Sequence, residues 1–178
     1  MIGSASIMTE RRRPGGRARR FAILLPGLLF AGAALAAADC SVSLSSLAFG
    51  TYDQLAAIAD DSTGTVTVTC TSIGNGGGVT RVVYSVAFST GASGSYQQRF
   101  MTSGTPRLNY NLYVDAARSS IWGNGNGGTQ LITGSLTVGP GVGNGTRTQT
   151  HTVYGRVPAQ QDAAVGSYTD AIILTLTF

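Results

Sequence analysis

The stretch Thr65–Thr71, TVTVTCT, alternates threonine with an apolar residue at every step. Successive side chains of a β-strand point to opposite faces, so Val66, Val68 and Cys70 share one face and the threonines share the other. Threonine and valine are β-branched and favour strands over helices. The stretch therefore predicts a half-buried β-strand that carries a cysteine on its buried face.

Similar runs fill most of the chain after residue 38. Apolar or alternating segments bounded by turn residues predict further strands at 41–49, 79–88, 107–115, 131–138, 146–157 and 168–178. The first run breaks its alternation once, at Ser45-Ser46, as a bulge or kink would require. Asp60–Gly64 and Gly123–Gly128 predict turns between strands, and Ala56–Ala59 indicates one short helical turn. Together these features predict an all-β, immunoglobulin-like β-sandwich formed by residues 39–178 as one domain.

The first 38 residues differ in character from the rest. An arginine-rich segment, an apolar run at Phe21–Leu35 and three alanines have the order of a secretory signal peptide. The apolar run is shorter than the roughly 20 residues that span a bilayer, although a retained membrane anchor is the alternative. We expect residues 1–38 to be removed by cleavage after Ala38 and the mature chain to be exported.

Cys40 and Cys70 are the only cysteines, and both lie in the predicted mature part. In an oxidising compartment an even pair of cysteines is typical of a disulfide. A loop of about 30 residues predicts roughly 3–4 kcal/mol of stabilisation from lost chain entropy. Two thiolates and the distant His151 do not make a metal-ligand set, and neither cysteine has an activating neighbour. We therefore expect a structural disulfide and no metal site.

The composition excludes several other kinds of chemistry. The chain has no lysine and one histidine, so a Schiff base, a phosphate-binding loop and a two-histidine metal site are excluded. The basic charge belongs to the first 38 residues, because residues 39–178 hold six arginines against seven aspartates. Without a basic stripe on the mature chain we expect no nucleic-acid partner. No motif joins a nucleophile to His151, so we expect neither an enzyme nor a cofactor.

The last predicted strand bears most directly on function. Its apolar face consists of Ile172, Leu174, Leu176 and Phe178. A long apolar strand at a sheet edge is a template for a strand from another chain. The pattern alone leaves two arrangements open: a sandwich that receives a strand from a partner, or a central strand flanked by earlier strands. In the first arrangement these four residues border the acceptor groove.

Three aromatic residues give a second, weaker hypothesis. Trp122 stands beside a glycine-rich turn, and with Tyr113 and Tyr96 it could form an aromatic contact surface for a sugar or an abiotic surface. The alternative is that Trp122 packs in the core.

Short motifs spread over residues 40–178 resemble the spore coat protein U domain family. They are Leu47–Tyr52, Gly64–Cys70, Arg99–Met101, Leu108–Tyr113, Trp122-Gly123, Val153–Pro158 and Gly166–Asp170, in that order. The resemblance implies a subunit of archaic chaperone–usher pili, that is, an immunoglobulin-like sandwich lacking its final strand. It further implies that a periplasmic chaperone fills the gap first. The N-terminal segment of another pilin subunit then replaces the chaperone at an outer-membrane usher, and the product reaches the cell surface.

One feature departs from that family's pattern. A polymerising subunit that resembles the family has a donor strand before its first cysteine, but only Asp39 separates the predicted cleavage site from Cys40. At about 3.3 Å per residue such a segment cannot fill a groove. We therefore expect a subunit that accepts a strand and gives none, as at the tip of a fibre. An autonomous secreted or spore-coat structural protein of the same fold is the alternative.

Overall fold

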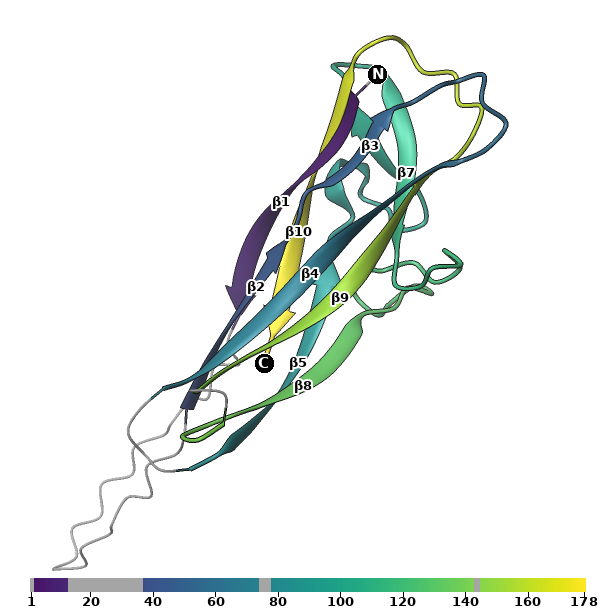
Figure 1. The fold of residues 1–178 in the computed structure, drawn as a ribbon. Helices are drawn as coiled ribbons and strands as arrows, with labels where there is room; N and C mark the ends of the chain where they lie inside the picture. Colours follow the sequence, from purple (N-terminus) through teal and green to yellow (C-terminus); the bar gives the residue numbers. More distant parts are fainter. Residues whose placement is uncertain (1, 13–36, 74–77, 143–144) are drawn as a thin grey trace, which may run out of the picture.

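The computed structural model describes residues 2–12, 37–73, 78–142 and 145–178, and nearly all regular structure in them is β (Figure 1). In chain order the elements are β1 (Ile2–Arg12), β2 (Ala37–Leu44), β3 (Leu47–Thr51), β4 (Asp60–Ile73), β5 (Thr80–Phe88), the 3₁₀ turn η1 (Gly91–Ser93), β6 (Arg99–Thr102), β7 (Arg107–Tyr113), β8 (Ile132–Val138), β9 (Thr146–Val157) and β10 (Ser167–Thr177). The described ranges contain no helix long and apolar enough to cross a membrane. The apolar run at 21–35 lies outside the described residues.

The strands form two layers that face each other across one core. The pairing order runs β2–β4–β9–β7–β6–β10–β1–β3, with β5 and β8 attached beside β10. Strand β7 joins the layers, because Asn111–Tyr113 pair with β9 and Arg107–Tyr110 pair with β6. Figure 1 shows β4 and β9 crossing in front of β10 and β5. The predicted all-β, immunoglobulin-like sandwich is confirmed.

The break at Ser45-Ser46 marks the point where the chain changes layer. Strand β2 before it pairs with β4, whereas β3 after it pairs with β1 in the opposite layer. The Ser45 amide donates to the Thr65 carbonyl at 2.9 Å, and the Thr65 amide donates to Ser45 Oγ at 2.8 Å. These two bonds hold the corner where the alternation fails.

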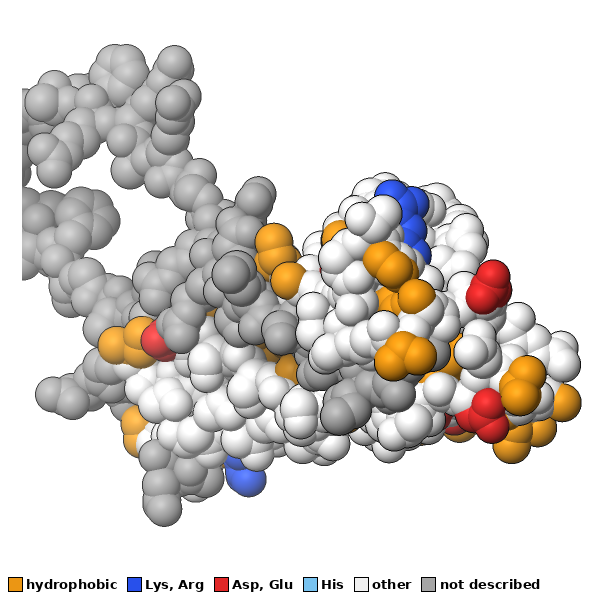
Figure 2. Space-filling view, turned by 90° about the horizontal axis from the view of Figure 1, so that it is seen from above, with side chains coloured by type: hydrophobic (Ala, Val, Ile, Leu, Met, Phe, Trp, Pro, Cys, Tyr) orange, Lys and Arg blue, Asp and Glu red, His pale blue; other side chains and the backbone are white. Residues whose placement is uncertain are grey.

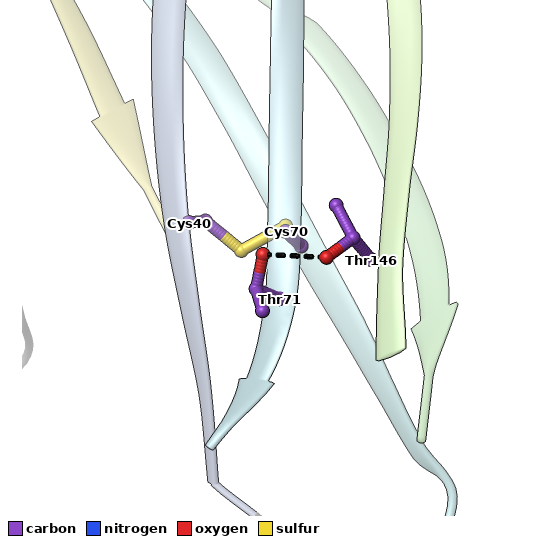
Figure 3. Close-up of a disulfide and its surroundings, with 4 residues drawn as sticks. All are labelled: Cys40, Cys70, Thr71 and Thr146. Carbon is purple, nitrogen blue, oxygen red and sulfur yellow. Dashed lines mark hydrogen bonds between the residues drawn. A yellow bond between two sulfur atoms is a disulfide. The ribbon is translucent and has the colours of Figure 1, made fainter. Parts of the chain in front are cut away.

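The stretch Thr65–Thr71 lies within β4 and shows the predicted alternation of buried and outward-facing residues. Val66, Val68 and Cys70 are fully buried, while the threonines between them point to the other face of β4. Cys40 lies directly opposite Cys70 in the β2–β4 ladder, and the predicted disulfide joins them (Figure 3). Beside the disulfide, Thr71 Oγ1 and Thr146 Oγ1 lie 3.1 Å apart and link β4 to β9.

Two local predictions are wrong. Asp60–Gly64 is the start of β4 rather than a turn, because these residues pair with β9 from Val157 to Val153. Asp61 is fixed there by Arg156, whose Nε and Nη2 donate at 2.7 and 2.9 Å. Ala56–Ala59 contains no helical turn. Pairing between distant strands overrides the local turn propensity of these segments.

The loops 52–59 and 158–166 lie together at one end of the molecule (Figure 1). Leu55, Ile58 and Val165 are exposed on these loops. Figure 2 looks down on this end and shows apolar side chains among uncharged polar surface, with few charged ones. The low content of charged residues in the sequence is therefore also seen on this part of the surface.

Candidate functional site

Strands β3 and β10 lie on either side of a space one strand wide. Neither pairs with the other, and β1 lies between them: parallel to β10 along its length, and antiparallel to β3 (Figure 1). The ladder with β10 runs from Ile2↔Ser167 to Arg12↔Thr177. The ladder with β3 is shorter and covers residues 2–5 of β1. The sheet is continuous here only because residues 2–12 supply a strand.

The β10 wall of this space is apolar on its inner side. Ile172, Leu174 and Leu176 are buried in the core, and Phe178 is partly buried against it. Ile173 on the opposite face of the strand is 39% exposed, so the period of two predicted from the sequence is present. The four predicted residues thus lie together on the β10 side of the seam, which is the one-strand space between β3 (Leu47–Thr51) and β10 (Ser167–Thr177) that β1 occupies.

The β3 wall is apolar as well. Leu47 and Phe49 are buried and point into the same core. Gly155 of β9 lies beneath them, and a Cβ at this position would come within 2.7 Å of Leu47 and 2.8 Å of Phe49. The absence of a side chain at Gly155 therefore lets β3 pack closely on the opposite layer.

Strand β10 is not a free edge in the described chain. On its other side Leu174 and Leu176 pair with Phe88 and Val86 of β5, and Thr169 pairs with Thr102 of β6. In the described chain β10 therefore has a neighbouring strand on each side, and one of these neighbours is β1. The covering strand, however, comes from the residues that the sequence predicts to be removed.

The residues of β1 in register with the inner face of β10 are mostly small or polar. Gly3, Ala5, Ile7, Thr9 and Arg11 align with Tyr168, Asp170, Ile172, Leu174 and Leu176 in turn. Ile7 is the one large aliphatic residue among those five.

A buried carboxylate lies in the middle of the β10 wall. Asp170 is 5% exposed and accepts hydrogen bonds from the Tyr110 hydroxyl at 2.7 Å, the Ala92 amide at 3.0 Å and its neighbour Ala171 at 2.8 Å. Gly91 has φ +64°, and a Cβ there would collide with this carboxylate. Burial, and then the adjacent carboxylate, raise the pKa of Tyr110 well above its usual range, so its hydroxyl stays a donor. Asp170 therefore ties β10 to β7 and to η1.

A buried arginine organises the neighbouring part of the core. The Arg99 guanidinium has no exposed surface and donates to the Ser89 carbonyl from Nε at 3.0 Å and from Nη2 at 2.8 Å. It also donates to Asn111 Oδ1 at 2.6 Å and to the Trp122 carbonyl at 2.8 Å. Desolvation lowers the pKa of Arg99. The sequence contained no signal for Arg99 or Asp170 beyond their places in the family-like motifs.

The predicted aromatic contact surface does not form as proposed. Trp122 has no exposed surface, packs edge-on against Phe88 and donates from Nε1 to the Val86 carbonyl at 3.0 Å. An indole that finds both an aromatic neighbour and an acceptor is stable in a core, so Trp122 is a core residue. Tyr113 and Tyr96 are half-buried, and the Tyr96 ring lies 5.3 Å from the Arg99 guanidinium carbon.

The described residues contain no group of three histidine, cysteine or acidic side chains that could hold a metal ion. The single histidine, His151, lies on β9 with its Nε2 2.8 Å from the Tyr84 hydroxyl. Burial lowers the pKa of His151.

Comparison with known proteins gives the family. The Spore Coat Protein U domain matches residues 28–175. The chain belongs to the Spore Coat Protein U domain family. The match includes β3 and β10 as far as Thr175, hence both walls of the seam, and excludes β1.

Two known proteins illustrate the range of this similarity. "Protein U" of Myxococcus xanthus is 35% identical to this spore coat U domain chain over 144 residues, which are 74% of this chain and 71% of that protein. Among solved structures, the chaperone–tip adhesion subunit pre-assembly complex from archaic chaperone-usher Csu pili of Acinetobacter baumannii contains a similar chain. The identity is 20%, the TM-score is 0.48, and the overlap covers 80% of this chain and 40% of that one. The chain therefore spans less than half the length of the solved chain.

Proposed function

We propose that this chain is an exported structural subunit whose sandwich is completed by a strand from another protein, as in a chaperone–usher fimbria. The observation that supports the proposal is the one-strand space between β3 and β10. Its occupant, β1, lies in the predicted leader and outside the family match. Once that leader is cleaved, both walls of the space have unpaired backbone groups.

The walls supply the two components of strand addition. Backbone N–H and C=O groups of β3 and β10 pair with an incoming strand, and apolar side chains of that strand cover the inner face. On the β10 side the contact residues are Ile172, Leu174, Leu176 and Phe178, and Leu47 and Phe49 are their counterparts on β3.

The proposed partners follow from family membership together with this gap. A periplasmic chaperone supplies the first strand, and another pilin subunit replaces it at an outer-membrane usher. The subunit is then displayed on the cell surface in a pilus and acts by cell adhesion rather than as an enzyme. Only Asp39 would precede Cys40 after cleavage, so the N-terminal segment is too short to act as a donor strand. A subunit that accepts a strand and donates none fits the tip of a fibre.

The experiment is to export residues 39–178 to a periplasm with and without a candidate chaperone from the same organism. We expect soluble, cooperatively unfolding protein only with the chaperone, in a one-to-one complex. Leu174→Asp should abolish the complex, and Ile173→Asp, the matched change on the exposed face of the same strand, should preserve it. A stable monomer without the chaperone would contradict the proposal.

A second function has one observation in its favour. In the full chain β10 is flanked on both sides by strands of the same protein, since β1 covers the seam. A protein that kept residues 2–12 would be an autonomous secreted or spore-coat structural protein. Mass spectrometry of the exported protein separates the two functions, because the first requires a mature N-terminus near Asp39 and the second requires residues 2–12 to be present.

A further inference from the structure

A hollow of about 450 Å³ lies outside the seam, between β7 and the segment that follows β9. Its lining residues come from three parts of the chain: Gln97 and Gln98 before β6, Asn109, Tyr110, Asn111 and Tyr113 on β7, and Pro158 and Gln161 after β9. Among the described residues that line it there is no charged side chain. The polar part of the lining therefore consists of uncharged groups, beside a larger apolar surface.

One wall of the hollow is fixed by Gln161. Its Oε1 accepts from the Asn109 amide at 2.8 Å, and its Nε2 donates to the Asn109 carbonyl at 2.9 Å and to the Pro158 carbonyl at 3.1 Å. The Gln161 backbone amide donates to the Tyr52 hydroxyl at 2.7 Å. The Gln161 side chain thus occupies the backbone groups of Asn109 that an added peptide strand would need, which disfavours an extended peptide as the ligand.

The opposite wall is supported by hydrogen bonds from Asn111, which is itself bonded to the buried Arg99. Asn111 Nδ2 donates to the carbonyls of Tyr96 and Gln97 at 2.8 and 3.2 Å, and its Oδ1 accepts from Arg99. Asn111 is 5% exposed, so this support is inside the protein. The segment that carries Gln97 and Gln98 is therefore positioned before any ligand arrives, which lowers the entropy cost of binding.

Three polar groups at the hollow remain available. In the part of the chain that the structure describes, the Gln98 amide, the Asn109 side-chain amide and the Tyr113 hydroxyl have no hydrogen-bond partner. Amides both donate and accept, and so does a neutral phenol. Desolvation raises the pKa of the Tyr113 hydroxyl, so the group stays protonated at neutral pH.

The nearest cations do not make this an anion site. Arg118 and Arg156 act electrostatically on Tyr113, but both pair with Asp61, at 3.2 and 2.7 Å. A neutral ligand with many hydroxyls suits the remaining groups, because each amide can donate to one hydroxyl and accept from another. The half-buried Tyr113 ring can pack against the C–H face of a sugar.

We propose that this hollow binds a neutral saccharide through Gln98, Asn109 and Tyr113. The site is separate from the β3–β10 seam, so a strand captured there contributes no residue to it. Of the three aromatic residues considered from the sequence, Tyr113 is the one at this site, and Tyr96 contributes through its backbone carbonyl.

The test is an NMR titration of the exported protein, recovered in its folded form, with cellotriose, chitotriose and maltotriose up to about 10 mM. We expect at least one sugar to shift the side-chain amide signals of Gln98 and Asn109. Tyr113→Ala should weaken binding about tenfold or more, Gln98→Ala several-fold, and Tyr113→Phe, which removes only the hydroxyl, less than Tyr113→Ala.

The matched control is Gln54→Ala, an exposed glutamine on the loop after β3, which should leave binding unchanged. Thermal unfolding of each variant shows that its fold is kept, so that a loss of binding reports on the site. The absence of shifts with all three sugars would overturn the proposal, and so would equal binding by Tyr113→Ala and Gln54→Ala. Shifts with a sialylated or uronic acid sugar alone would overturn it as well, since they would indicate an anion site.

Discussion

The layer formed by β2, β4 and β9 and the seam formed by β3, β1 and β10 are completed in different ways. In the first, β4 and β9 pair continuously from Asp60↔Val157 to Thr71↔Thr146, and the Cys40–Cys70 disulfide joins β2 to β4. In the second, β3 and β10 are connected only through β1, a strand from the first 12 residues. The first region, the closed half, consists of residues of the predicted mature chain apart from Ala37 and Ala38. The seam, in contrast, requires β1 from the predicted leader.

This difference shows how one sequence can combine stability with a need for a partner. Both regions bury alternating apolar residues, so the hydrophobic contribution is similar in kind. They differ in the source of their strands, because β2, β4 and β9 lie within residues 37–157 whereas β1 lies within residues 2–12. The disulfide lies in the closed half, where it can keep β2 and β4 together before a strand is bound at the seam.

The largest effect should come from a charge in the seam. Leu174→Asp places a carboxylate at a fully buried position without a partner, which should destabilise the folded protein by more than about 4 kcal/mol. Ile173→Asp, on the exposed face of the same strand, should change stability by less than about 1 kcal/mol. Thermal unfolding followed by circular dichroism compares the two, and equal effects would mean that the inner face of β10 has no special role.

Removal of the disulfide tests the closed half. The double variant Cys40→Ala, Cys70→Ala should lose about 3–4 kcal/mol, because the bond closes a loop with a sequence separation of 30. Urea unfolding measures the loss. A change below about 1 kcal/mol would show that the β4–β9 ladder alone holds this half together.

A smaller effect is expected at the junction of the two regions. Asp170→Ala should cost about 2–3 kcal/mol, because it leaves the buried Tyr110 hydroxyl and the Ala92 amide without their acceptor. Tyr110→Phe should cost about 1 kcal/mol less than that, since Asp170 keeps two of its donors. A double-mutant cycle with both changes measures the coupling, and strict additivity would contradict a direct bond.

The smallest effect is the pH dependence of the closed half. Because burial lowers the pKa of His151, the unfolded chain binds a proton at a higher pH than the folded chain does. The stabilisation by neutral His151 is complete above its ordinary pKa of 6.5 and decreases as the pH falls below that value. We expect the melting temperature to drop between pH 7 and about pH 5.5, and His151→Gln to flatten this dependence. An unchanged slope in the variant would assign the dependence to another group.

The sequence predicts the closed half well because its patterns are local. The alternation of Thr65–Thr71 fixes which face is buried, and the position of Cys70 on that face fits a disulfide with Cys40. The irregularity at Ser45-Ser46 also has a structural cause, the change of layer. In these cases a period of two within one strand determines the outcome.

The features that the sequence did not predict depend on contacts between distant segments. Asp60–Gly64 has turn composition, but an ion pair of Asp61 with Arg156 and the ladder with β9 keep it extended. Arg99 is buried because carbonyls and Asn111 from distant segments surround its guanidinium, which no local pattern encodes. The covering of β10 by β1 depends on the pairing of the two ends of the chain. Such pairings cannot be read from either segment alone.

The most direct test of strand capture at the seam is amide hydrogen exchange on residues 39–178, first in the isolated chaperone complex and then after release of the chaperone. We predict that β3 and the seam-facing amides of β10 are protected in the complex and lose protection on release, before β4 and β9 do. Equal protection of β3, β10, β4 and β9 with and without the chaperone would contradict it, because the sandwich would then be complete on its own.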